Sequence, residues 1–231
     1  VGTLSSTDDF GNFWSNIVVA PGVILEADGL GESQPLVAGI KGGGGFRKVG
    51  PGSLVMTQYT TKDGTVRAGY GPNAYTGPTF IEEGVLKLKK GNTLKQSREV
   101  SISSGASLVF AGKGTNNGAD QIKRLSVKEG GTVGFEGKNQ GKLFITDNSG
   151  NADVVLNNSG SIDLNVLEQN NNKQAITVNS GRISAAESFS ITGSLVNTGV
   201  IGSKAFDMVN GYEVCQKIAV SECLLMAKTV Y

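Results

Sequence analysis

The stretch of sequence that decides the fold reads Val100-Ser101-Ile102-Ser103-Ser104-Gly105-Ala106-Ser107-Leu108-Val109-Phe110. It consists of two short runs, in which apolar residues recur at every second position, joined at a central glycine. Further copies of this pattern centre on Gly22, Gly84, Gly130, Gly160 and Gly181. Neither run alone can bury enough apolar surface to be stable, so the copies are expected to stack on one another. The pattern therefore predicts a solenoid.

The spacing of the central glycines indicates how much chain each coil uses. Gly84 and Gly105 are 21 residues apart, Gly160 and Gly181 are also 21 apart, and Gly105 and Gly130 are 25 apart. Three short strands joined by turns use about 20 to 25 residues, which corresponds to one coil of a parallel β-helix. The repeating unit is therefore interpreted as one coil.

The apolar residues of each copy lie two positions apart, which sends their side chains to one face of a strand. In Leu125-Ser126-Val127, for example, Leu125 and Val127 are expected to point inward. Few windows show the three-to-four residue spacing of an amphipathic helix. The predicted fold class is all-β, a right-handed parallel β-helix of about ten coils over residues 1–204.

A second recurring signal marks the turns. It occurs as Asn148-Ser149-Gly150, Asn158-Ser159-Gly160, Asn179-Ser180-Gly181 and Asn197-Thr198-Gly199. Asn and Gly both tolerate positive φ, so a bend repeated in successive coils would select them. If the coils stack in register, we expect these asparagines to form a ladder of side-chain amides.

The composition excludes several classes of protein. Glycine accounts for 34 of 231 residues and proline for 5, which fits turns and excludes collagen and proline-rich linkers. With 21 basic and 20 acidic residues the chain lacks the positive field of a nucleic-acid binder, and no nucleic-acid partner is expected. No run of 18 apolar residues predicts a membrane-spanning helix. No leader pattern begins at Val1, so any export signal is expected to have been removed or to lie outside this sequence.

Two stretches carry a more specific motif. The first contains Lys48, Gly50, Gly52 and Leu54, and the second contains Asn73, Tyr75, Gly77, Thr79 and Gly84. Together they resemble the autotransporter-associated repeat of bacterial type V secreted passengers. The full motif covers about residues 38–90, and weaker copies extend to about residue 202. The resemblance implies a passenger carried to the surface of a Gram-negative cell through a β-barrel translocator, which this sequence does not contain.

The chain departs from that family pattern by an insertion. Residues 58–71 separate two halves of the motif that usually lie a few residues apart. The inserted loop contains Tyr59, Arg67 and Tyr70, an aromatic and cationic mixture of the kind enriched at interfaces. It is predicted either to contact a partner or to be a solvated excursion without a ligand.

The residues offer little catalytic chemistry. Histidine is absent, which removes the base of Ser-His-Asp and Cys-His systems and a common zinc ligand. Asp147, Asp153 and Asp163 are candidates for the two carboxylates that glycoside cleavage requires. Aromatic residues form only 6% of the chain, so sugar-stacking platforms are scarce and a structural or solvent-facing role is expected for these aspartates. Since phosphate-binding and calcium loops are also missing, we predict no enzyme, cofactor or metal.

The last segment, 205–231, differs in composition because glycine nearly disappears and apolar residues become denser. An open solenoid end invites pairing with other chains, so this segment is a candidate C-terminal cap. It contains both cysteines, Cys215 and Cys223. A disulfide between them requires the chain to fold back, and two unpaired buried thiols are the alternative.

Together with the predicted solenoid, the resemblance to the autotransporter repeat implies the surface-exposed or secreted passenger region of an autotransporter that acts in adhesion, self-association or presentation. The expected partners are a host-cell or matrix protein, a glycan, or another copy of the chain, with membrane association only through the absent translocator. Two other functions are consistent with the same fold. One is a polysaccharide-degrading enzyme of the tailspike or lyase type, and the other is a purely structural stalk.

Overall fold

The structure is a computed structural model built from short strands. It describes residues 3–4, 17–29, 34–36, 39–57, 73–89, 93–112, 119–137, 139–169, 173–209 and 213–215. Within these ranges the chain forms 23 β-strands and no helix. The strands belong to three sheets, which we call A, B and C.

Sheet A forms one side of the coil. Its spatial order is β1 (Thr3–Leu4), β3 (Ile24–Asp28), β6 (Gly45–Val49), β9 (Thr79–Ile81), β11 (Val100–Ile102), β14 (Leu125–Val127), β17 (Val154–Asn158), β19 (Ile176–Asn179), β21 (Ser194–Asn197) and β23 (Glu213–Cys215). The spatial order follows the chain order, so each new coil lies directly on the preceding one.

Sheet C forms the second side of the coil and part of the third. Its first leg contains β4 (Gln34–Leu36), β7 (Ser53–Met56), β10 (Val85–Leu88), β12 (Ser107–Phe110) and β15 (Thr132–Phe135). Three long strands then bend round the corner and cover both sides: β18 (Ser161–Gln169), β20 (Arg182–Thr192) and β22 (Val200–Val209). The third side also contains β13 (Ala119–Ile122) and β16 (Lys142–Ile145), and, in sheet B, β2 (Ile17–Val19), β5 (Ile40–Gly42) and β8 (Ala74–Tyr75).

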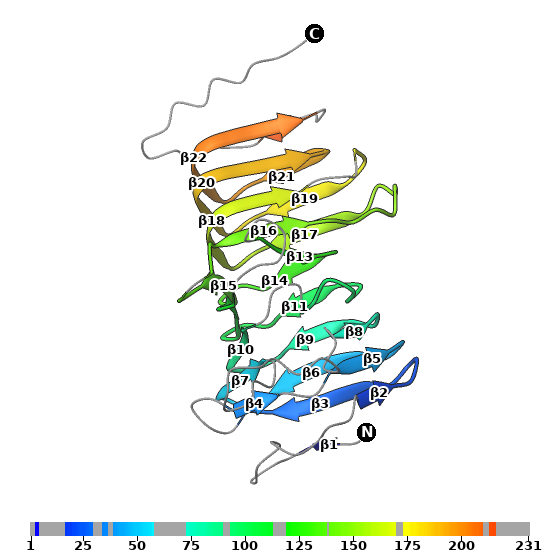
Figure 1. Cartoon of the computed structure of the whole chain (residues 1–231). Helices are drawn as coiled ribbons and strands as arrows, with labels where there is room; N and C mark the ends of the chain where they lie inside the picture. Colours follow the sequence, from blue (N-terminus) through cyan, green and yellow to red (C-terminus); the bar gives the residue numbers. More distant parts are fainter. Residues whose placement is uncertain are drawn as a thin grey trace.

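All pairings between the described strands are parallel. Figure 1 shows the strands stacked along one long axis, with β3 near one end and β22 near the other. Since parallel neighbours require a crossover, the chain must travel round the coil between them. The predicted parallel β-solenoid is confirmed.

The interior is one continuous apolar column. Leu86 pairs with Leu54 below it and Leu108 above it, and all three are buried. The same alternation holds across the strands, and the buried side chains form one cluster that extends from Val19 to Leu195. Because this cluster is continuous, the coils share one core. Each fully buried aliphatic side chain in it contributes about 1.5–3 kcal/mol relative to an exposed one.

Five of the six predicted hinge glycines occupy one corner of the coil, between sheet A and the first leg of sheet C. Gly84, Gly105 and Gly130 adopt positive φ there. At Gly160 and Gly181 the reason for glycine is a close approach, because an added Cβ would overlap backbone of the coil below. The sixth, Gly22, also has positive φ but lies at a different corner, between β2 and β3.

The predicted asparagine ladder forms at this same corner in three successive coils. The Nδ2 group of Asn158 donates to Oδ1 of Asn179 at 2.8 Å, and Nδ2 of Asn179 donates to Oδ1 of Asn197 at 2.7 Å. All three side chains are buried. Asn148 is exposed and lies at another corner, between β16 and β17, so its triplet does not join the ladder.

The third side of the coil is interrupted between β8 and β13. Residues 93–97 form a turn there, and no described strand joins sheet B to the third-side strands of sheet C. Leu94 fills the interior in place of a strand. We call this level, which includes β9 and β11, the waist.

The predicted boundary at residue 204 falls within β22, which pairs with β20 up to Val209. Strand β23 then pairs with β21, so the backbone of the last segment continues the stack at least to Cys215. The rest of the proposed cap, 216–231, lies outside the described residues. The cap and the number of ten coils stay predictions.

Candidate functional site

Several residues singled out from the sequence lie outside the described part of the chain. They are Tyr59, Arg67 and Tyr70 of the inserted loop, and Cys223. Cys215 lies in β23, opposite Asn197 of β21 in the parallel register. The partner-contact loop and the disulfide therefore stay predictions.

The second half of the repeat motif has a structural role. The hydroxyl of Tyr75 is 2.6 Å from Oγ1 of Thr79, which donates to Oγ of Ser97 at 2.9 Å. Ser97 is in turn within hydrogen-bond distance of the backbone carbonyls of Gly77 and Glu99. These side chains are buried, and burial raises the pKa of the Tyr75 hydroxyl despite its bond to Thr79. The hydroxyl chain closes the coil at the waist, where a third-side strand is missing.

The first half of the motif places a lysine inside the coil. Lys48 is fully buried, and its Nζ donates to the carbonyl oxygens of Val49, Gly50 and Glu83 at 2.8, 2.5 and 2.9 Å. Three bonds satisfy all the donors of an ammonium group. Burial lowers the pKa of Lys48, while the nearby charges of Asp28 and Glu83 oppose that shift. The lysine ties two coils together at the corner between sheets A and C.

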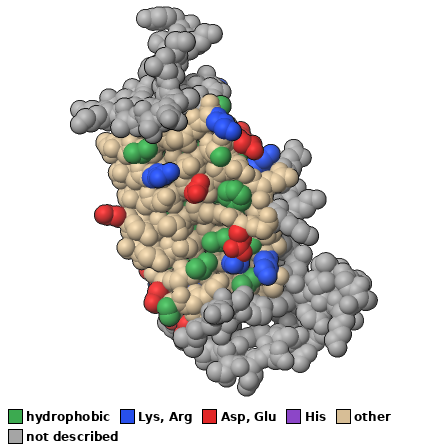
Figure 2. Space-filling model, turned by 90° about the vertical axis from the view of Figure 1, so that its left-hand side faces the viewer, with side chains coloured by type: hydrophobic (Ala, Val, Ile, Leu, Met, Phe, Trp, Pro, Cys, Tyr) green, Lys and Arg blue, Asp and Glu red, His purple; other side chains and the backbone are tan. Residues whose placement is uncertain are grey.

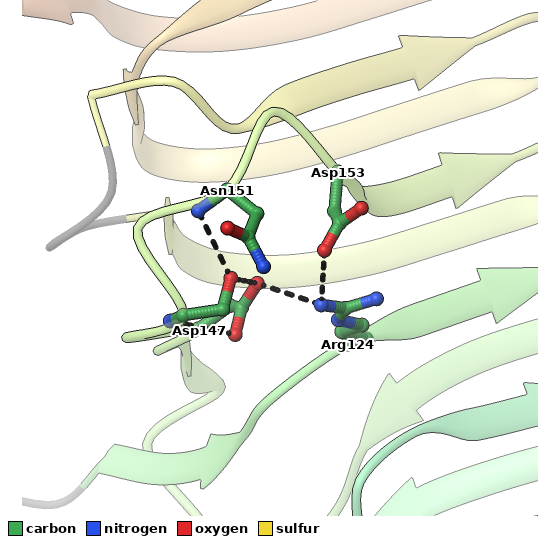
Figure 3. A network of polar contacts seen from close by, with 5 residues as sticks. Arg124, Asp147, Asn151 and Asp153 are labelled. Carbon is green, nitrogen blue, oxygen red and sulfur yellow. Dashed lines mark hydrogen bonds and ion pairs between the residues drawn. The ribbon is translucent and has the colours of Figure 1, made fainter.

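Two of the three candidate aspartates meet at one arginine (Figure 3). The Arg124 guanidinium is 3.2 Å from Oδ2 of Asp147 and 2.6 Å from Oδ2 of Asp153. Ser149 also donates from its backbone and its hydroxyl to the carboxylate of Asp147. Partial burial lowers the pKa of Arg124, but the bonds and charges of Asp153 and Asp147 outweigh it and raise the pKa. This cluster holds the turn between β16 and β17 against the start of β14.

The third candidate, Asp163, is exposed on β18, on the first leg of sheet C. It therefore does not join Asp147 and Asp153. A pair of carboxylates facing each other across a groove, as glycoside cleavage requires, is not assembled from these three residues.

A surface that the sequence did not reveal runs along the outside of sheet A. The name outer column is used here for six of its positions, Glu26, Arg47, Phe80, Ser101, Ser126 and Asn157, beyond which the same register continues with Val178 and Val196. Each member pairs in register with the next, and each lies between inward-facing neighbours. Outward positions carry no periodic signal, and the register between coils depends on turn lengths. The sequence alone therefore could not align these residues.

At the charged end of the outer column, the hydrogen-bonding capacity of Arg47 is only partly used. Arg47 lies over the ring of Phe80, 5.7 Å from its centroid, and reaches Oε2 of Glu26 at 3.5 Å. The side chains of Arg47 and Glu26 are 39% and 24% exposed. A guanidinium has five donors; Nε of Arg47 is buried without a partner, and the single long bond from Nη1 leaves the other donors of the two Nη groups free of other described residues. This end of the column can therefore bind polar groups.

The side of the molecule shown in Figure 2 has a different character. Uncharged polar side chains and backbone dominate it, and hydrophobic, acidic and basic groups are scattered. Lys87 and Glu136 form an ion pair of 2.7 Å on the first leg of sheet C. Among the described residues no group of three His, Cys, Asp or Glu side chains is placed to hold a metal, and no described helix is long and apolar enough to cross a membrane.

Comparisons of this chain with protein families, with curated proteins and with solved structures give no match. The fold is therefore shown by the strand pairings alone, and a fold does not determine a function.

Proposed function

We propose that this chain is the surface-exposed or secreted passenger region of a Gram-negative autotransporter, acting in adhesion, self-association or presentation. The observation that carries the proposal is the single uninterrupted apolar core shared by the parallel coils. A solenoid of this kind exposes long lateral faces, and contact along such faces sums many weak interactions.

The repeat motif supports the proposal because its residues have definite roles in the coil. Lys48 binds carbonyl groups at the corner, Tyr75 and Thr79 form the buried hydroxyl chain, and Asn73 accepts a hydrogen bond from the backbone of Ile40 in the preceding coil. A sequence that resembles the autotransporter repeat thus places its matching residues where they stabilise a coil. The carboxylate arrangement around Arg124 gives the enzymatic alternative no comparable support.

The test is to express the complete precursor in a Gram-negative strain and to detect this chain with an antibody. Protease added to intact cells is expected to remove the antigen, and two differently labelled populations that carry it are expected to form mixed clumps or to attach to host cells. A precursor lacking residues 17–209 is the control. An antigen that stays protected until the cells are lysed would contradict the proposal. Surface exposure without clumping or attachment would favour the stalk.

A further inference from the structure

The outer column combines chemical groups that recognise sugars. Along its length it presents a carboxylate, a guanidinium, an aromatic ring, two hydroxyls and an amide, in the order Glu26, Arg47, Phe80, Ser101, Ser126, Asn157. A pyranose ring has an apolar C–H face, which packs on an aromatic ring, and a rim of hydroxyls, which bond to carboxylate, guanidinium, hydroxyl and amide groups.

The spacing of the column suits a linear chain. Neighbouring strands are about 4.8 Å apart, so the six residues extend over roughly 24 Å along the solenoid axis. This interval is close to the length of one pyranose unit in an extended polysaccharide. Successive sugars can therefore meet successive coils, and the sheet holds the binding groups in place before the ligand arrives.

The middle of the column is low and has free hydrogen-bonding groups. After Phe80, the column continues with two small residues, Ser101 and Ser126, and then with Asn157. None of the hydrogen bonds between described residues uses the side chains of these last three. Arg47 lies over the ring of Phe80 from the strand below, and the next residue in the register above Phe80, Ser101, is small.

A polar flank lies beside this low stretch. Arg124 immediately precedes β14, the strand of Ser126. Its partner Asp153 has a side chain that is 40% exposed, and it precedes β17, the strand of Asn157. Carboxylate oxygens of this cluster can accept further hydroxyl hydrogens at the edge of the sheet.

Other partners fit the column less well. A protein interface requires several aromatic or aliphatic anchors that lie close together, whereas two serines and Asn157 separate Phe80 from Val178 and Val196, the next apolar residues of the same register. A nucleic acid requires a basic stripe, whereas Arg47 is balanced by Glu26. Because the two charges compensate each other, a neutral chain fits better than a polyanion.

We propose that the outer column of sheet A binds a linear, neutral polysaccharide chain that runs parallel to the solenoid axis. The inference rests on the proposed contact role of this chain and names the partner class. Phe80 stacks on one sugar ring, Arg47 and Glu26 bind its hydroxyls, and Ser101, Ser126 and Asn157 bind the following units.

The experiment uses the purified 231-residue chain and measures the affinity for linear hexasaccharides by calorimetry. The probes are a neutral β-1,4-glucan, a neutral α-1,4-glucan, and a uronic acid polymer fragment as the charged counterpart. We expect one neutral probe to bind, and Phe80→Leu and Arg47→Met each to weaken it about tenfold or more, equivalent to about 1.4 kcal/mol. Lys87→Met on the first leg of sheet C is the matched control and is expected to bind as the wild type does.

Circular dichroism and thermal melting of each variant show whether the fold is retained, and Ser126→Val provides a second variant with little effect on packing. Absence of binding by all three probes, or binding that the column variants leave unchanged, would overturn the inference. Cells that still clump in that case would preserve the proposed function and indicate a protein partner. Saccharide binding by a chain that never reaches the cell surface would support the inference and contradict the proposed function.

Discussion

Lys48 illustrates how one residue can be charged and buried inside a solenoid. Its ammonium group is surrounded by three backbone carbonyls, which replace the water it loses. Gly29 leaves room for the side chain, because a Cβ at that position would come within 2.8 Å of the lysine Cε. Desolvation is only partly compensated, and the pKa of Lys48 is lowered from its ordinary value of 10.5.

The lowered pKa predicts a pH dependence of stability. Between the folded-state pKa and 10.5 the unfolded chain binds more protons than the folded chain, so the free energy of unfolding rises with pH in that window. We expect the stability of the wild type relative to Lys48→Met to increase from neutral pH toward pH 10.5. Urea denaturation of both proteins at several pH values measures this difference and cancels the titration of other groups. A constant or decreasing difference would contradict the prediction.

At the scale of the strand and its corner, the asparagine ladder makes the middle residue critical. Replacing Asn179 by alanine leaves buried amide groups of Asn158 and Asn197 without their ladder partners. Unsatisfied buried polar groups are expensive, so Asn179→Ala is expected to reduce the free energy of unfolding by about 2–4 kcal/mol. Ser180→Ala, which removes an exposed hydroxyl at the same corner, is the control and should change stability by less than about 0.5 kcal/mol. Equal losses for both variants would show that the ladder contributes nothing.

The corner glycines give a second prediction for this element. An added Cβ at Gly181 would overlap the carbonyl oxygen of Gly160, whereas one at Gly202 meets no atom within 4 Å. Gly181→Ala should therefore destabilise the protein by about 1–3 kcal/mol, as overpacking does, and Gly202→Ala by less than about 0.5 kcal/mol. Melting temperatures of the two variants test this contrast, and it is wrong if they are the same.

The sequence predicted the strands and corners because their causes are local. Alternating apolar residues such as Leu125 and Val127 identify the inward face, and repeated Asn-Ser-Gly triplets identify bends. The triplet at Asn148 has the same letters but lies at another corner, because three residues do not specify where the coil bends. Arg124 and Asp153 are 29 residues apart, and only the folded coil brings them together.

At the scale of the whole molecule, we expect the waist to be the least stable level between the two ends of the solenoid. No described strand occupies the third side there, so the coils are joined at this level through sheet A and the first leg of sheet C. Stability in a solenoid is a sum of neighbour interfaces, so fewer hydrogen bonds weaken this level. Backbone amides of β9 and β11 are expected to exchange hydrogen faster than those of β18 and β20. Hydrogen exchange measured by mass spectrometry tests this, and uniform protection along the stack would contradict it.

The outer column shows why function is harder to predict than fold. Sequence period and turn chemistry define a coil, but the residues on its outside obey no such period. The outer column exists because turns of different length bring Arg47, Phe80 and Ser101 to the same register. A partner is recognised by that assembled surface, which only the three-dimensional structure reveals.

Two of the corners of the coil differ in how much the length of their connections varies. Between sheet A and sheet C the connection is short in coil after coil, as between Ile81 and Val85 or between Asn158 and Ser161. After the first leg of sheet C the length varies widely, since β7 ends at Met56 and β8 begins at Ala74, whereas β18 continues through the bend. Evolution can therefore lengthen one turn of the spiral without shifting the pitch of the rest. A solenoid of this kind can gain or lose a surface loop in one coil while the apolar core and the neighbouring coils stay the same.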